Sequence, residues 1–218
     1  MTTRTHHIIQ IGLMLAALVL SLIFWNKMPD RIPIHYNLQG EIDNYGPKGM
    51  LFLLFPGIGL LVYAIIQLLP MIDPKRNIRD YMDNFRSFGT ILMAFLFCLY
   101  LVQLLGILGY SHNLNQYIPM LIIFMMMALG NFFGKLRPNY FIGIRTPWTL
   151  ENERVWIKTH RFAGYVWVLA SIVMLIAFPF LKGNFLQGLF IAYIGVLVAA
   201  PVLYSFIIYR KLKNGTAI

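Results

Sequence analysis

Six long apolar stretches constrain this chain more than any other feature of its sequence. Each has 17 to 24 residues and contains no Asp, Glu, Lys, Arg or His. With a rise of about 1.5 Å per residue, a helix of this length crosses or nearly crosses a hydrocarbon core about 30 Å thick. The sequence therefore predicts an all-α fold, a polytopic membrane helix bundle of six transmembrane helices. The stretches are residues 8–25, 51–69, 89–108, 118–134, 164–181 and 186–209.

The overall composition supports this membrane class. Of the 218 residues, 59% are hydrophobic and 12% are charged, whereas charged residues make up about a quarter of a typical soluble protein. The stretch 8–25 is longer than the apolar core of a signal peptide and is not followed by a small-residue cleavage motif. We therefore expect it to be retained as the first span.

The distribution of charge predicts how the bundle is oriented. If the N-terminus lies inside, fourteen of the eighteen Lys and Arg residues fall in inside segments. The positive-inside rule then places both termini in the cytoplasm, an N-in/C-in topology. Basic residues so placed report orientation and contact with the lipid bilayer, and no separate basic and aromatic surface remains for nucleic acid. We expect no direct nucleic-acid partner.

The segment 26–50 is predicted to be an ordered outer loop. It is rich in Pro, Gly, Asn and Asp, which favour turns for separate steric and hydrogen-bonding reasons. Within it Ile32, Ile34 and Tyr36 alternate with other residues, as expected for a short extended segment on an apolar surface. This segment should therefore cap the outer face of the bundle.

Three residues of the outer loop are of types that bind metal ions, namely His35, Glu41 and Asp43. Their spacing contains no paired-ligand motif, so we predict no metal site and no cofactor. Hydrogen-bonded loop structure is the expected role of these side chains. Contact with a peptide or a lipid headgroup is the alternative.

The segment 135–163 is predicted to be an ordered inner loop followed by an amphipathic helix. Residues 137–138 and 146–147 each place a residue before a proline, which should interrupt any helix. Thr149 is then the expected N-cap, with acidic residues in the first turn where the helix dipole favours them. From Leu150 the helix should run through Trp156 and His160, which are four residues apart and share one face.

The inner segment gathers side chains that hydrogen-bond in fixed directions beside several Gly and Pro residues. We interpret this as a pre-formed cytoplasmic pocket or docking surface, although an interfacial aromatic belt with headgroup contacts explains part of the pattern. No catalytic residue is predicted, because no nucleophile-base motif is present; a pair of His160 with Glu151 or Glu153 is the alternative that an enzyme would need. The candidate binding residues are Asn131, Arg137, Asn139, Arg145, Thr146, Trp148, Trp156, His160 and Arg161.

Small residues predict where helices approach each other closely. Gly130 and Gly134 form a small-xxx-small pair at the end of the fourth stretch. A longer series in the last stretch, Gly188, Ala192, Gly195 and Ala199, also lies along one helix face. Both are expected to pack against another helix.

The inner segment closely resembles the signature of the SdpI-type immunity proteins, a family of bacterial membrane proteins. The resemblance rests on GN at 130–131, KLRPN at 135–139, GIRTPWTLENERVW at 143–156 and THR at 159–161. The outer loop resembles an uncharacterised module that often precedes this signature, with the pattern IP-x-H-x-N-x-x-G-x-x-D and a following Lys. Tyr36 stands where that pattern often has Trp.

The resemblance implies two regions, 1–70 with the outer module and 71–218 with a four-helix SdpI-like region, packed as one membrane domain. It implies a non-enzymatic, multi-pass protein of the bacterial cytoplasmic membrane. Such a protein would protect against a secreted antimicrobial peptide toxin on the outer face and relay its presence to a cytoplasmic regulator. A small transporter or flippase-like protein for a neutral or lipidic substrate is the alternative. The candidate outer-loop binding residues are His35, Asn37, Asp43 and Lys48.

Overall fold

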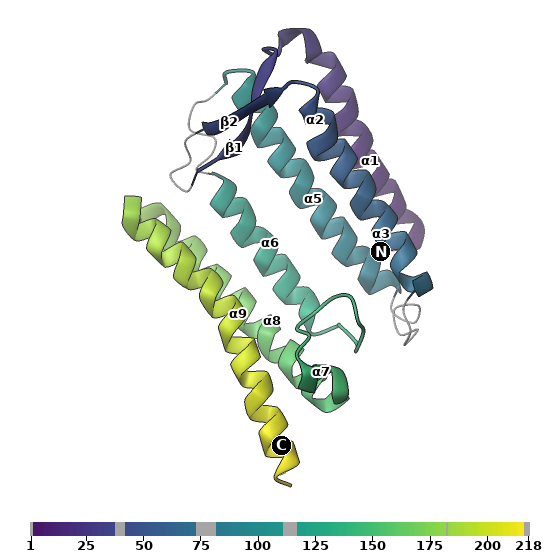
Figure 1. Cartoon of the computed structure of the whole chain (residues 1–218), viewed down its shortest axis with the longest axis vertical. Coiled ribbons are helices and arrows are strands. Elements are labelled where there is room, and N and C mark those ends of the chain that lie inside the picture. The colour runs from purple at the N-terminus through teal and green to yellow at the C-terminus, as the bar shows by residue number, and fades with distance from the viewer. Residues whose placement is uncertain (1, 38–41, 73–81, 111–116, 182, 216–218) are drawn as a thin grey trace. The chain divides into compact units, whose positions relative to one another are not determined.

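The computed structural model describes residues 2–37, 42–72, 82–110, 117–181 and 183–215. It is 79% helical, in agreement with an all-α membrane bundle. Its elements are α1 (Thr3–Ile23), η1 (Trp25–Lys27), β1 (Arg31–Tyr36), β2 (Ile42–Pro47), α2 (Met50–Phe52), η2 (Leu53–Gly57), α3 (Ile58–Ile72), α5 (Met82–Ile107), α6 (Tyr117–Phe133), α7 (Pro147–Glu151), α8 (Glu153–Ala177), η4 (Phe178–Phe180) and α9 (Gly183–Lys213) (Figure 1).

Each predicted apolar stretch lies in a helix. Five helical segments of the described chain are long and apolar enough to cross a membrane, and α6 is a shorter apolar helix of 17 residues. Six spans and the N-in/C-in orientation remain predictions. Glu41 and the charged residues Lys75, Arg76 and Arg79 lie outside the described residues.

The chain forms two compact units. The first comprises Met1–Ile66 and Gly89–Ile122, and the second comprises Gln67–Phe88 and Ile123–Ile218. The outer hairpin belongs to the first unit, whereas α7, α8 and α9 belong to the second. The predicted boundary at residue 70 stays a prediction.

The second apolar stretch contains a π-helical turn. Helix α2 continues through η2 into α3, and the five residues of η2 include Pro56. Proline has no backbone N–H and its ring collides with the preceding turn, so an α-helix must distort around it. Widening one turn to a π-helix lets the chain remain helical on both sides.

The outer loop forms an antiparallel hairpin of β1 and β2. Its register pairs Arg31 with Pro47 and Ile32 with Gly46, and becomes irregular beyond Pro33. Ile32 is fully buried in an apolar cluster that α1 and α5 also supply. The expected extended segment on an apolar surface is therefore confirmed. A strand pair was not predicted from the sequence. An apolar helix surface offers no hydrogen-bond partners to the backbone of β1, so β1 pairs with β2 instead.

Gln103 of α5 anchors this hairpin. Its amide nitrogen donates to the backbone oxygen of Pro33, and its amide oxygen accepts from Tyr36 Oη over 3.0 Å. Burial raises the pKa of Tyr36, which keeps the hydroxyl protonated and able to donate. The Gln103 side chain of α5 thereby fixes the position of the hairpin.

The variant Gln103→Leu is expected to loosen the hairpin. It leaves the Tyr36 hydroxyl and the Pro33 carbonyl without their partner, at about 1–3 kcal/mol for each unpaired buried group. Backbone amides of β1 and β2 should then exchange hydrogen faster in a nanodisc-embedded protein. Tyr36→Phe removes one of the two bonds and should give a smaller increase. Equal exchange in both variants and the wild type would contradict the anchoring role.

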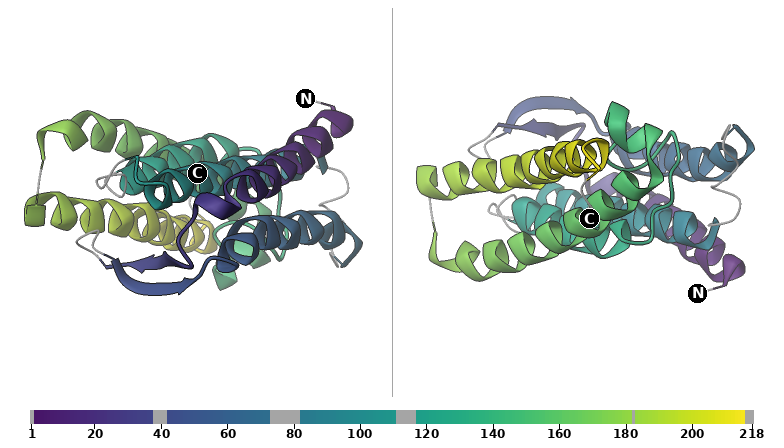
Figure 2. Two further views of the ribbon diagram at one scale, coloured as in Figure 1. Left: turned by 90° about the horizontal axis from the view of Figure 1, so that it is seen from above. Right: turned by 90° about the horizontal axis from the view of Figure 1, so that it is seen from below.

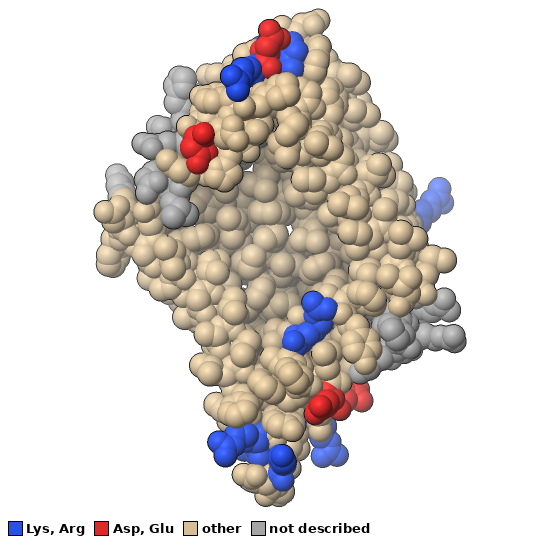
Figure 3. Space-filling model, viewed as in Figure 1, with Lys and Arg blue, Asp and Glu red and all other residues tan. Residues whose placement is uncertain are grey.

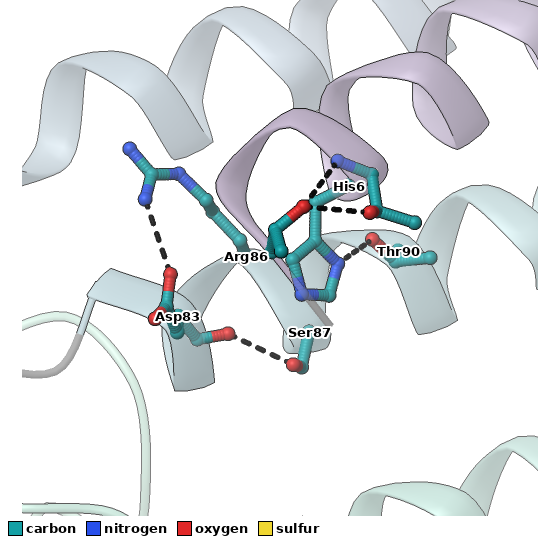
Figure 4. Close-up of polar contacts among 7 residues, drawn as sticks. His6, Asp83, Arg86, Ser87 and Thr90 are labelled. Atoms are coloured by element: carbon teal, nitrogen blue, oxygen red, sulfur yellow. Dashed lines mark hydrogen bonds and ion pairs between the residues drawn. The ribbon is translucent and has the colours of Figure 1, made fainter.

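Short polar contacts mark the ends of the apolar helices (Figure 4). In the first unit, His6 Nδ1 on α1 lies 3.0 Å from Thr90 Oγ1 on α5. In the second unit, within the first two turns of α5, the Arg86 guanidinium lies 3.4 Å from the Asp83 carboxylate, and Ser87 Oγ donates to the Asp83 backbone oxygen over 2.8 Å. These groups stand near helix ends, where polar side chains reach the membrane surface at the lowest cost.

Helices α8 and α9 lie side by side in the second unit (Figure 2). A proline inside α9 contributes to their contact. Pro201 has no N–H to bond the carbonyl of Leu197, and that oxygen instead accepts the indole N–H of Trp167 on α8 over 2.8 Å. Toward the end of α8, Ser171 and Tyr193 join the two helices through their hydroxyls at 2.7 Å.

The small-residue predictions differ in outcome. A Cβ added at Gly164 of α8 would lie 2.8 Å from the backbone oxygen of Gly130, and one at Gly130 would lie 2.6 Å from Trp167 Cβ. Helices α6 and α8 therefore approach closely at Gly130, as expected. The series that includes Gly188 and Gly195 is exposed and has nothing within 4 Å of an added Cβ. That series does not pack within the described chain, because the buried face of α9 is formed by its larger residues.

Candidate functional site

The candidate site lies at one end of the second unit, where the loop after α6 meets α7, α8 and the end of α9. Figure 3 shows Lys and Arg side chains gathered at this end of the second unit. The loop packs on an apolar cluster that includes Phe132, Phe133, Leu136 and Trp156. The predicted ordered inner loop is thus built on a solid apolar base.

Asn139 organises the loop. Its side-chain oxygen accepts from the backbone N–H groups of Phe141 and Ile142, both over 2.8 Å. Its amide nitrogen donates to the backbone oxygens of Arg137 and Ile142 over 2.9 and 3.1 Å. With 4% of its surface exposed, the side chain uses all of its hydrogen-bonding capacity inside the loop. Asn139 therefore shapes the site and does not face a ligand.

Trp156 and His160 form a buried ring pair, as their shared helix face predicts. Their rings stack with centroids 4.1 Å apart, and both residues are at most 1% exposed. The Trp156 indole N–H donates to the Leu136 backbone oxygen over 3.0 Å. Trp156 is thus buried in the core of the loop and does not belong to an interfacial aromatic belt.

Backbone groups occupy both ring nitrogens of His160. Nδ1 lies 2.8 Å from the Trp156 backbone oxygen and must donate to it, while Nε2 accepts the backbone N–H of Ile144 over 2.9 Å. This pattern requires the neutral ring with its single proton on Nδ1. No ring nitrogen remains for an acid-base pair with Glu151 or Glu153.

Gly143 lets the loop lie against this ring pair. Its φ of +121° is unfavourable for any residue with a side chain. A Cβ at this position would lie 2.4 Å from His160 Nε2 and 3.1 Å from the Trp156 ring. Gly143 is therefore required both by its backbone angle and by the lack of space.

The helix start differs from the prediction. Thr146, and not Thr149, is the N-cap of α7. The two threonines form a capping box, in which each side chain accepts the backbone N–H of the other. Thr149 Oγ1 also donates to the Ile144 backbone oxygen over 2.8 Å. A second cap follows at once, because Asn152 Oδ1 accepts from the first backbone N–H groups of α8. The predicted single helix from Leu150 was wrong; two helices meet at Asn152, and only the second continues through Trp156 and His160.

Trp148 fixes α7 to the end of α9. Its indole N–H donates to Ser205 Oγ over 2.7 Å, and its ring stacks on Tyr209 with centroids 6.1 Å apart. Phe206 lies against the same ring at 5.4 Å. This contact makes α7 and the last turns of α9 one rigid surface.

The remaining candidate residues of the inner segment are exposed. Arg145 donates to the Tyr140 backbone oxygen, and Arg137 lies 3.9 Å from the carboxylate of Glu153. Asn131 and Arg161 also face outward. The structure therefore divides the predicted site residues into buried ones that hold the loop and exposed ones that a partner can reach.

The outer candidate residues lie on or beside the hairpin. His35 Nδ1 on β1 is 2.6 Å from Asp43 Oδ1 on β2, and both side chains are largely exposed. Lys48 lies 3.0 Å from the Asp30 carboxylate and 4.8 Å from the Trp25 ring centroid. Asn37 follows β1 directly and is half-buried. Among the described residues, no group of three metal-binding side chains is found.

Several residues that build the site were not predicted. Gly143, Asn152 and Ser205 each make a contact described above, yet none was a candidate. Pro147 could have indicated a short helix that starts directly after Thr146, because proline is favoured at the first helical position. Ser205 carries no local signal, since its partner Trp148 is 57 residues away in the chain.

Residues 135–205, which hold this site, match the model of the SdpI/YfhL protein family. The resemblance to the SdpI-type family is confirmed. Residues 12–60, with the outer hairpin, match the Domain of unknown function (DUF1648). Over 210 residues the chain is 27% identical to Immunity protein SdpI of Bacillus subtilis (strain 168), covering 95% of this chain and 98% of that protein. No solved structure matches the chain.

The similarity to the SdpI-type immunity proteins and the apolar helices together support a multi-pass membrane protein. Each of the two matched regions contains one of the two ordered loops. The SdpI/YfhL match begins at Lys135, just after α6, and includes all of α7 and α8. The other match contains the hairpin that Gln103 anchors.

Proposed function

We propose that this chain is a non-enzymatic immunity protein of the bacterial cytoplasmic membrane that protects the cell against a secreted antimicrobial peptide. The observation that carries the proposal is the similarity to Immunity protein SdpI along nearly the whole chain, both ordered loops included. The excess of basic residues in the inner segments supports a cytoplasmic position for both termini. The hairpin then faces the side from which a secreted peptide arrives.

The hairpin is suited to meet such a peptide. It is held on the bundle by Gln103 and Ile32, so binding to it costs little conformational entropy. Its exposed His35 and Asp43 present an imidazole and a carboxylate at its surface. In this proposal these two side chains contact the peptide, and the buried residues keep them in place.

The loop after α6, together with α7 and α8, would relay the presence of the peptide to a cytoplasmic regulator. The exposed Arg145 is available to a partner protein, while Asn139 and the ring pair keep the surface in shape. The variant Arg145→Ala should reduce the response of the regulator without reducing protection. Arg145→Lys keeps the charge and should restore the response if the charge is what the partner reads.

Survival of cells exposed to the peptide tests protection. A Bacillus subtilis strain without Immunity protein SdpI would express this chain and grow in medium conditioned by toxin-secreting cells. Cells that express His35→Ala or Asp43→Ala should be half-killed by about tenfold less peptide than cells that express the wild-type chain. Each variant removes a hydrogen bond to a charged group, and such a bond contributes about 1.5–3 kcal/mol to binding.

The control for this test is Lys27→Gln, which removes a charge from the same side of the first unit but outside the hairpin. It should protect as well as the wild type at equal membrane levels. If the wild-type chain gives no protection, the proposed function is wrong. If His35→Ala and Asp43→Ala protect fully, the hairpin is not the contact site.

A further inference from the structure

The exposed face of α8 changes character along its length. From its second turn onward it presents the half-buried Lys158 and the exposed Arg161, Tyr165, Leu169 and Ile172, which lie at i, i+3, i+7, i+11 and i+14 and so on one side of the helix. Tyr165 is 71% exposed and Leu169 is 61% exposed. The opposite side carries the buried ring pair and Gly164. The order along this outer stripe is basic, then aromatic, then apolar.

The two cations of the stripe, Lys158 and Arg161, have no ion-pair partner among the residues that the structure describes. Arg137, by contrast, lies near Glu153 on a different side of α8. Basic side chains close to an anionic membrane surface are attracted to it. An unpaired pair of cations one turn apart is therefore available to bind a phosphate group.

The stripe matches one phospholipid in length and polarity. Lys158 and Ile172 are 14 residues apart, which is about 21 Å along a helix. One leaflet with its headgroups is about 20–22 Å thick. Tyr165 lies between the basic and apolar parts, at the level where tyrosine is enriched in membrane proteins. Beside the stripe, the Phe162 ring stacks on Tyr204 of α9 with centroids 4.1 Å apart, so the neighbouring surface is fixed.

We propose that the outer stripe of α8 binds an anionic phospholipid selectively. Lys158 and Arg161 hold the headgroup phosphate, Tyr165 lies at the glycerol level, and Leu169 and Ile172 lie along an acyl chain. The proposal does not depend on the immunity function. It assigns a specific lipid site to a part of the family region whose other side forms the candidate functional site.

Native mass spectrometry tests the selectivity. The full chain in detergent micelles is mixed with equal amounts of phosphatidylglycerol and phosphatidylcholine that carry the same acyl chains. The wild type should retain phosphatidylglycerol in preference. In the double variant Lys158→Gln/Arg161→Gln the ratio of the two bound lipids should fall by about fivefold for each charge removed. Lys158→Arg should keep the wild-type ratio.

The matched control is Lys211→Gln/Lys213→Gln, which removes two charges from the end of α9. Its lipid ratio should stay within about twofold of the wild type, since these residues are off the stripe. An equal fall in both double variants would mean diffuse attraction and would overturn the site. Excess inorganic phosphate should not displace the bound lipid; displacement would identify a simple anion site and also overturn the proposal. Unchanged melting of each variant confirms that it folds.

Discussion

In the Gly143→Ala variant, trypsin should cleave the chain after Arg145 at least about tenfold faster than in the wild type. The added Cβ has no room, since it would lie 2.4 Å from His160 Nε2. A φ of +121° costs a residue with a side chain about 1–3 kcal/mol, and overlap in a packed core costs about 1–3 kcal/mol more. Each 1.4 kcal/mol raises the population of the open loop tenfold.

The loop opens because its backbone must move away from the rings. The bond from the Ile144 N–H to His160 Nε2 is then broken, and the ring nitrogen loses its donor. Proteolysis measures this open population when the loop opens and closes faster than it is cut. Hydrogen exchange across residues 138–146 should rise in parallel.

Gly134→Ala is the control for this prediction. Gly134 lies just before the loop, has an ordinary backbone angle and has no atom of the described residues within 4 Å of an added Cβ. Its cleavage after Arg145 should match the wild type. If Gly143→Ala were cut no faster than Gly134→Ala, the ring pair would not be what holds the loop.

The second large effect is expected for Gly164→Ala, which should lower the melting temperature of the protein in detergent. The added methyl would lie 2.8 Å from the backbone oxygen of Gly130, and a backbone atom cannot move aside without separating α6 from α8. Over-packing of this kind costs about 1–3 kcal/mol, or roughly 2–4 °C in melting temperature for each kcal/mol. Tryptophan fluorescence reports the transition, because Trp167 lies beside this crossing.

Gly195→Ala makes the same chemical change in a helix but should have the opposite sign. Gly195 is exposed on α9, and in the part of the chain that the structure describes nothing lies within 4 Å of its added Cβ. Alanine is favoured over glycine in a helix by about 0.5–1 kcal/mol. A lower melting temperature for Gly195→Ala than for Gly164→Ala would show that the α6–α8 crossing is not a tight contact.

These two glycines show what local sequence can and cannot predict. The spacing of Gly130 and Gly134 correctly indicated a close approach, because a small-xxx-small pair lets helix backbones meet. The same kind of spacing around Gly195 was misleading. A pattern on one helix shows that a partner can come close, but the partner itself depends on how distant segments pack.

In the candidate site, too, some features could be predicted from local sequence and others depend on the fold. The i, i+4 spacing predicted that Trp156 and His160 share a face, but did not predict that this face is the buried one. The helix cap was misplaced because Thr146 and Thr149 are both good caps, and only the folded loop selects Thr146. The long apolar helices could be located from the length and composition of each stretch, because these properties do not depend on the rest of the chain. Contacts such as Trp148 with Ser205 need the fold.

Helix α8 joins two hydrogen-bonded contacts as one continuous rod. Its 25 residues are helical without interruption, which gives a rod about 37 Å long with the ring pair nearer one end and Ser171 toward the other. His160 and Ser171 are separated by about 16 Å along the helix axis. A tilt of about 5° around the ring pair would therefore displace the Ser171 hydroxyl by about 1.4 Å, enough to break its 2.7 Å contact with Tyr193.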